Sequence, residues 1–256
     1  MIKYEHINKV GRITLNRPEK YHSFIREMAL DLQDILKECE RNKDVRSILL
    51  TSEGKAFCAG QDLSEFEDPL NINFSKVIEE HYNPIIRIIR QIEKPVIAAV
   101  NGIAAGAGAS LTLSCDIIVA HENASFIQAF SKIGLIPDSG STFFLPRLIG
   151  MQKAAALMMT GESISAQEAM DIGMIYKVFP EKEFLEKSWE IANKLSEMPT
   201  RSIGLTKRLL NASFSNNLED QLNMEKDFQI KSGNTVDFQE GITSFLEKRK
   251  PEFKGE

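Results

Sequence analysis

The chain has 256 residues, of which 43% are hydrophobic and 26% are charged. These proportions are typical of a globular protein and exclude a disordered tail, a collagen-like fibre and a disulfide scaffold. The 31 basic residues are mixed along the chain with 36 acidic ones, which disfavours a nucleic-acid partner. The three cysteines have no CxxC spacing, the N-terminus lacks the apolar run of a signal peptide, and no run of about 18 apolar residues is present. We therefore expect a cytoplasmic protein with no metal site and no membrane partner.

Strand-like and helix-like segments alternate in the first half of the chain. β-Branched or alternating apolar runs predict strands, and apolar residues at helical spacing predict helices. In chain order we expect a hairpin over 2–6 and 11–15, a helix over 24–41, a strand over 45–50, a helix over 75–92, a strand over 96–100, a helix around 111–113 and a strand over 117–120. This rhythm favours parallel strands joined by crossover helices.

The second half is dominated by helical spacing. We expect helices over 151–160, 165–172, 182–196, 201–215 and 217–247, with a single convincing strand signal at 175–179. The segment 64–75 is polar, has no clear period and is the best candidate for a mobile loop. The sequence thus predicts an α/β core followed by a helical C-terminal part.

Two segments rich in small residues follow predicted strands. Residues 55–63, KAFCAGQDL, could present a backbone N–H to a ligand or form an ordinary turn. Residues 101–110, NGIAAGAGAS, open a helix, and their small side chains leave space for another backbone or for a ligand. A helix N-terminus carries unpaired N–H groups that suit an anion or a developing oxyanion. The G-x-G-x-x-G pattern of dinucleotide-binding loops is not met, and close helix–strand packing is the alternative.

The third segment, residues 132–142, contains one carboxylate beside apolar residues. Asp138 follows Pro137 and lies near Leu135, Ile136 and Phe143 in the sequence. An apolar environment raises the pKa of a carboxyl group, and a raised pKa suits a general acid or base. The alternative is a helix cap, because Asp-Ser-Gly-Ser-Thr is good capping chemistry.

Together these segments resemble the crotonase, or enoyl-CoA hydratase/isomerase, superfamily. The resemblance covers nearly the whole chain and rests on Asn16-Arg17-Pro18, KAFCAGQDL, KPVIAAVNG with AAGAGAS, the Cys115-Asp116 pair and the C-terminal FLEKR at 245–249. It implies an α/β fold with a spiral of repeated β-β-α units over residues 1–195. It also implies a helical trimerisation region over 196–256, in a homotrimer or homohexamer.

The resemblance also implies a site for an acyl-CoA thioester. The backbone N–H groups of Gln61 and Ala107 would hold the thioester carbonyl. Tyr82 would line the acyl pocket, although simple packing is equally compatible with the sequence. Further positions expected at the substrate are Ala59, Gly60, Asp62, Leu63, Gly108, Ser110 and Phe130. Asp62 could instead cap a turn, and Ser110 could be a buried helix serine. The basic run 248–250 could meet a CoA phosphate or simply end a helix.

The departures from the family pattern narrow the chemistry. Ser110 and Phe130 occupy the positions of the two glutamates with which the family's hydratases activate water. Neither side chain can act as a general acid or base, so the two-glutamate hydratase and the isomerase that keeps the second glutamate are both disfavoured. Asp138 instead resembles the aspartate of a branch that includes epoxyphenylacetyl-CoA isomerases of phenylacetate degradation and single-carboxylate enoyl isomerases. Dienoyl-CoA isomerases and a dehalogenase place an aspartate similarly.

The similarity to the epoxyphenylacetyl-CoA isomerases extends through FCAGQDL, Tyr82-Asn83-Pro84 and AFSKIGLIPDSG. We therefore expect an isomerase that forms an enolate in a backbone oxyanion hole, with Asp138 as acid and base. No cofactor is expected beyond the coenzyme A of the substrate. The alternatives are an enoyl-CoA hydratase of fatty-acid β-oxidation and a non-catalytic CoA-binding member of the superfamily.

Overall fold

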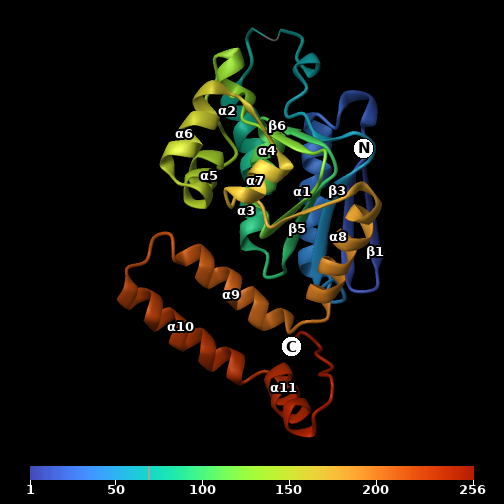
Figure 1. Ribbon diagram of the computed structural model, residues 1–256, viewed down its shortest axis with the longest axis vertical. Helices are drawn as coiled ribbons and strands as arrows, with labels where there is room; N and C mark the ends of the chain where they lie inside the picture. The colour runs from blue at the N-terminus through green and yellow to red at the C-terminus, as the bar shows by residue number, and fades with distance from the viewer. Residues whose placement is uncertain (69) are drawn as a thin grey trace.

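A six-stranded sheet forms the centre of the computed structural model, which describes residues 1–68 and 70–256 (Figure 1). Its strand order is β1-β2-β3-β5-β7-β10. The β1–β2 hairpin is antiparallel and the other strand pairs are parallel. The strands are β1 (Ile2–Ile7), β2 (Val10–Leu15), β3 (Ser47–Ser52), β5 (Val96–Val100), β7 (Ile117–His121) and β10 (Lys177–Phe179).

A second sheet of four short strands lies beside the first, in the order β4-β6-β8-β9. These strands are β4 (Ala56–Cys58), β6 (Ile103–Ala105), β8 (Ser125–Ile127) and β9 (Ser163–Ser165). Each pass of the chain adds one strand to each sheet, first β3 and β4, then β5 and β6, then β7 and β8. This arrangement confirms the predicted spiral of β-β-α units.

The inner strands β2, β3, β5 and β7 of the larger sheet are mostly buried, which explains their nearly continuous apolar runs. Ile48 and Leu50 of β3 pack into the main core cluster, whereas Leu49 packs into a second cluster on the other face. Helices α1 (Arg26–Arg41) and α3 (Asn83–Gln91) supply Leu32 and other residues to the main cluster. Helix α8 (Glu181–Ser196) covers the opposite face with Phe184 and Ala192.

The remaining helices of the described chain surround this core or continue beyond it. They are η1 (Pro18–Lys20), η2 (Leu63–Glu65), α2 (Phe74–Lys76), η3 (Val77–Tyr82), α4 (Ala107–Ser114), η4 (Ala129–Ile133), α5 (Ser141–Ile149), α6 (Met151–Thr160), α7 (Ala166–Asp171), α9 (Thr200–Ala212), α10 (Leu218–Gly233) and α11 (Val236–Glu247). Within the described residues, no helix has the length and apolarity needed to cross a membrane.

Three expectations about elements were wrong in detail. The helix expected over 75–92 is divided by the π-helical turn η3. The helix expected over 217–247 is two helices, because the chain breaks at Asn234 and the Thr235 side chain caps α11. After residue 150 the prediction of a single strand missed β9, since three residues are too short to show a period.

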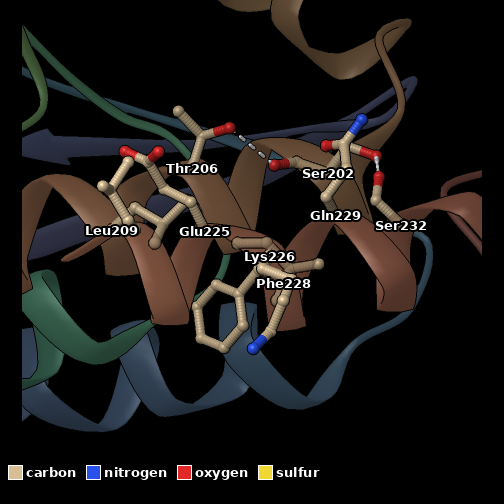
Figure 2. A pocket seen from close by; sticks show the side chains of 10 residues that line it. Ser202, Thr206, Leu209, Glu225, Lys226, Phe228, Gln229 and Ser232 are labelled. Atoms are coloured by element: carbon tan, nitrogen blue, oxygen red, sulfur yellow. Dashed lines mark hydrogen bonds between the residues drawn. The ribbon is translucent and has the colours of Figure 1, made fainter. Parts of the chain in front are cut away.

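The last three helices form an arm that lies below the two sheets in Figure 1. Helix α9 joins the arm to the core through the buried ammonium of Lys207, which lies 2.7 Å from a carboxylate oxygen of Asp116. Figure 2 shows the groove between α9 and α10, about 510 Å³ in volume, where the Ser202 and Ser232 hydroxyl oxygens are 2.6 Å apart. The boundary at residue 195 and the trimerisation role of the arm remain predictions.

Candidate active site

A cavity of about 230 Å³ lies where the ends of β4 and β6 meet α4, η3 and η4. Its walls collect residues from both small-residue segments and from the segment that contains Asp138. Eight of the residues expected at the substrate line it: Ala59, Gly60, Gln61, Leu63, Tyr82, Ala107, Phe130 and Asp138. Segments far apart in the sequence therefore converge on one apolar hollow.

The two small-residue segments approach each other at backbone distance. Gly60 has φ of +93° and Gly106 has φ of +53°, a region that L side chains rarely adopt. A Cβ atom on Gly60 would lie 3.1 Å from the carbonyl oxygen of Ala105 and 3.4 Å from the backbone nitrogen of Ala107. Glycine is therefore needed here both for the turn and for the contact between the segments.

This contact brings two unpaired backbone donors to the cavity. Among the hydrogen bonds between described residues, none is donated by the backbone N–H of Gln61 or of Ala107. The Gln61 segment is fixed on both sides, because Phe24 N–H donates to Gly60 O at 2.6 Å and Asp62 N–H donates to Phe24 O at 2.9 Å. Ala107 is the first residue of α4, whose N-terminus carries partial positive charge. Two fixed donors at one hollow can stabilise an oxyanion.

The side chain of Gln61 is held away from this role by its own hydrogen bonds. The hydroxyl of Tyr82 donates to Gln61 Oε1 at 2.7 Å, and Gln61 Nε2 donates to Glu65 Oε2 at 2.8 Å and to Phe24 O at 3.0 Å. Burial raises the pKa of Tyr82 well above its ordinary value, so its hydroxyl keeps its proton. This network leaves the backbone N–H of Gln61 as the group that can meet a ligand.

Asp138 is the acidic residue among those that line the cavity. Its side chain is half-buried, and burial raises the pKa of its carboxyl group. The Ser139 hydroxyl donates to Asp138 Oδ1 at 2.9 Å. Helix α5 begins after Gly140 without a side-chain cap, so the alternative that Asp138 is a helix cap is wrong. A carboxylate with a raised pKa beside two free N–H donors can take up and return a proton.

Three residues expected at the substrate are absent from the cavity lining and lie behind its wall. Asp62 accepts from the backbone N–H of Ser64 at 3.0 Å and pairs with Arg17 at 2.7 Å, which matches the alternative of a turn cap. The pKa of Asp62 is lowered, first by the hydroxyl of Ser64. Gly108 lets α4 reach β4, because a Cβ there would lie 2.3 Å from the Cys58 carbonyl oxygen. Ser110 is buried and donates to Gly106 O at 3.1 Å.

Much of the cavity wall escaped the sequence reasoning. It is apolar and consists of Phe66, Ile72, Phe74, Val77, Ile78, Ala129, Ile133 and Leu135. The first three come from the segment 64–75, which was expected to be a polar mobile loop and of which Pro69 lies outside the described residues. The few apolar residues within that polar segment were the one sequence feature that could have indicated a role in the cavity wall. The basic run at 248–250 is elsewhere, and Arg249 pairs with Glu240 and with Glu247 on α11.

Known proteins resemble this chain over nearly its whole length. The family model described as enoyl-CoA hydratase/isomerase matches residues 5–256. A 1,2-epoxyphenylacetyl-CoA isomerase of Escherichia coli strain K12 is 43% identical over 254 residues, which cover 98% of this chain and 97% of that protein. A protein of Rhodobacter capsulatus described as a probable enoyl-CoA hydratase is 40% identical, covering 99% of this chain and 98% of its own.

The fold has close relatives among solved structures. The crystal structure of an enoyl-CoA hydratase from Bacillus anthracis superimposes with a TM-score of 0.94 at 36% identity. The superposition covers 100% of this chain and 99% of that one. Isomerase and hydratase names thus both occur among proteins similar to this chain over nearly its whole length.

Proposed function

Because this chain belongs to the enoyl-CoA hydratase/isomerase family, we propose that it is a CoA-thioester isomerase with Asp138 as its one proton carrier. The observation that carries the proposal is the composition of the cavity. Its lining contains one carboxylate, on Asp138, together with the unpaired backbone N–H groups of Gln61 and Ala107. These groups are sufficient to form and stabilise an enolate. The lining contains no second carboxylate that could act as another acid or base.

In the proposed reaction, the thioester carbonyl oxygen accepts hydrogen bonds from the two backbone N–H groups. Asp138 removes a proton from a carbon that this carbonyl acidifies, and negative charge moves onto the carbonyl oxygen. Each backbone donor contributes about 3 kcal/mol to stabilising such an oxyanion. Asp138 then returns the proton to a different carbon, which moves the double bond by a 1,3-shift. The backbone donors polarise the carbonyl, so the proposed steps require no cofactor besides the coenzyme A of the substrate.

For the natural substrate we propose the ring epoxide of phenylacetyl-CoA, converted in phenylacetate degradation. Breaking the carbon–carbon bond that the epoxide oxygen bridges, with both C–O bonds kept, would expand the six-membered ring into a seven-membered oxygen heterocycle. The similarity to the E. coli 1,2-epoxyphenylacetyl-CoA isomerase supports this choice. Phe66, Phe74 and Phe130 in the apolar wall suit an aromatic-derived ring.

Water addition to an enoyl-CoA is the second candidate, since hydratases are among the similar proteins. A hydratase of the two-glutamate type needs two carboxylates to activate water. Here the corresponding positions hold Ser110, whose hydroxyl donates to Gly106 O, and Phe130, whose ring lines the cavity. A non-catalytic role is disfavoured by Asp138, because this half-buried carboxylate has no side-chain partner among the described residues beyond Ser139. We further propose that the chain forms a homotrimer or homohexamer.

The test is a spectrophotometric assay on a 3-enoyl-CoA that follows the appearance of the conjugated 2-enoyl thioester. Wild-type protein should produce it, and Asp138→Asn should lower kcat by about 10²–10⁴-fold, the usual contribution of a general base. The ring epoxide should be turned over as well and should lose activity in the same variant. Full turnover by Asp138→Asn, or tight CoA-thioester binding with no turnover of either compound, would contradict the proposal.

Folding of the variant provides its control. Burial raises the pKa of Asp138 in the folded protein above its ordinary value of 3.8, so the folded protein holds this proton more tightly than the unfolded chain does. The carboxyl group therefore favours folding less as the pH rises through its folded pKa. At neutral pH, Asp138→Asn should unfold at the same temperature as wild type or at a higher one. A loss of activity with lower thermal stability would instead indicate misfolding.

A further inference from the structure

Ser139 has a backbone conformation that its side chain disfavours. Its φ is +52°, and Gly140 follows with φ of +76°, so two consecutive residues are left-handed. Glycine adopts this region freely, whereas an ordinary L residue pays about 1 kcal/mol for it. Strain of this kind persists where the surrounding structure uses it, often beside a functional group.

The hydroxyl of this residue has one partner. Ser139 is 3% exposed, and its Oγ donates to Asp138 Oδ1 at 2.9 Å. No other side chain of the described residues donates a hydrogen bond to the Asp138 carboxylate, so Ser139 fixes one oxygen and Oδ2 remains available. In this left-handed turn the hydroxyl of Ser139 reaches back to the carboxylate of Asp138.

We propose that Ser139 is a positioning residue: its hydroxyl fixes Asp138 Oδ1 so that Oδ2 serves as the proton acceptor, and it favours the ionised form of the carboxylate. The proposal rests on the function proposed above. Burial raises the pKa of Asp138, and the hydrogen bond from Ser139 opposes that rise because it favours the charged form. Without the hydroxyl, the buried carboxylate would hold its proton to a higher pH.

The surroundings of Asp138 contain few other groups that could set its ionisation. Tyr82 of η3 is the other titratable residue among those that line the cavity, and its hydroxyl donates to Gln61 rather than to Asp138. From α3, which packs near α5, Arg90 is paired with Asp116 at 3.2 Å. The pKa shift of Asp138 has burial as its largest cause and hydrogen bonds as the others, with no contribution from a charged side chain among the described residues.

Two substitutions separate the hydroxyl from the backbone strain. Ser139→Ala removes the hydroxyl and keeps a side chain in the left-handed region, whereas Ser139→Gly removes the hydroxyl and relieves the strain. Ser141→Ala is the matched control, because Ser141 is also buried and its hydroxyl has no hydrogen-bond partner among the described residues. The measurement is kcat/KM for a 3-enoyl-CoA as a function of pH.

Both Ser139 variants should move the acid limb of the profile to higher pH. On that limb kcat/KM should fall about tenfold, the effect expected for losing one hydrogen bond to a charged group. The loss should be smaller at higher pH, and Ser141→Ala should keep the wild-type midpoint. An unchanged midpoint, an equal loss at every pH, or recovery of the wild-type profile in Ser139→Gly would overturn the proposal.

A second readout needs no turnover. The ¹³C resonance of the Asp138 carboxyl, in protein labelled at aspartate and assigned by its absence in Asp138→Asn, reports the ionisation directly. Its titration midpoint should rise in Ser139→Ala and in Ser139→Gly but not in Ser141→Ala. If the wild-type protein is inactive but the midpoint rises in both Ser139 variants, the proposed function is refuted and the Ser139–Asp138 coupling stands. If the wild-type protein is active but the midpoint does not rise in the variants, the coupling alone is refuted.

Discussion

Gly60 permits a close backbone contact at the cavity because it has no side chain. Its φ of +93° disfavours any L side chain, and a Cβ atom there would lie only 3.1 Å from the carbonyl oxygen of Ala105. Gly60→Ala should push the Gln61 and Ala107 segments apart and misplace the two N–H donors. We expect kcat to fall about 10²-fold, the effect of losing one oxyanion donor, in the 3-enoyl-CoA assay.

A second glycine supplies the control for this substitution. Gly54 also has a left-handed φ, of +70°, but a Cβ there would meet only Pro18 at 3.8 Å, and the residue does not line the cavity. Gly54→Ala should lose about 1 kcal/mol of unfolding free energy from backbone strain and keep its kcat. If both variants lost stability equally and both kept activity, the close approach at Gly60 would have no catalytic role.

At the residue scale, short sequence motifs predicted several residues that line the cavity. The backbone geometry was needed to choose between the alternative roles of these residues. KAFCAGQDL and AAGAGAS were predicted to meet, and Gln61 and Ala107 do lie on one cavity. The choice between a cap and a free carboxylate at Asp138 required the start of α5, which a pattern of Asp, Ser and Gly does not locate. The Ser139 contact depends on a φ angle, and no periodicity encodes that angle.

Among the elements, α9 uses a buried cation as one of its attachments to the core. Lys207 is 5% exposed, and its ammonium donates to the carbonyl oxygen of Ile89 at 2.6 Å and to Asp116 Oδ2 at 2.7 Å. Lys207→Met would leave Asp116 with Arg90 as its remaining cationic partner. Breaking a buried ion pair from one side should lower the unfolding free energy by about 3 kcal/mol, measurable by urea denaturation.

Lys187 provides the matched control on α8. Its ion pair with Glu190, at 2.9 Å, lies on the surface, where water and salt screen the charges. Lys187→Met should therefore leave the urea midpoint unchanged. If Lys207→Met had an equally small effect, apolar packing rather than the ion pair would be what holds α9 against the core.

Element prediction succeeded where a period had room to appear. The strand expected at 96–100 has those bounds in β5, and the helix expected over 24–41 is α1 from Arg26 to Arg41. The second sheet was missed because its strands are three residues long and show no alternation. The division of 75–92 also escaped, because the π-helical turn that places Tyr82 keeps the apolar spacing of a helix.

For the whole molecule, the spiral is a repeat of geometry rather than of sequence. Each β-β-α unit adds one strand to each sheet, yet the strand pairs β3–β4 and β5–β6 share little beyond apolar character. No internal repeat was therefore visible in the sequence, and the fold was predicted through the family resemblance. Composition and periodicity alone predict only a parallel α/β core followed by a helical C-terminal part.

The arm carries an apolar stripe that the described chain leaves uncovered. Phe238, Ile242, Phe245 and Leu246 of α11 are 48%, 48%, 80% and 73% exposed. Their spacing of four, seven and eight residues from Phe238 places them along one face of the helix. Because a contiguous exposed apolar face marks an interaction site, the stripe supports the proposed homo-oligomer, in which a second copy of the chain would cover it.

Two charges placed on this stripe should break the assembly without unfolding the protomer. We expect wild-type protein to elute as a trimer or hexamer in light-scattering chromatography, and Ile242→Glu with Phe245→Glu to elute as a smaller species with unchanged helical content. Thr243→Glu is the control, since it adds a negative charge to α11 outside the stripe. A monomeric wild type would refute the oligomer. An intact oligomer in the stripe variant would require the contact between copies to lie elsewhere on the molecule, because buried glutamates without partners cost several kcal/mol.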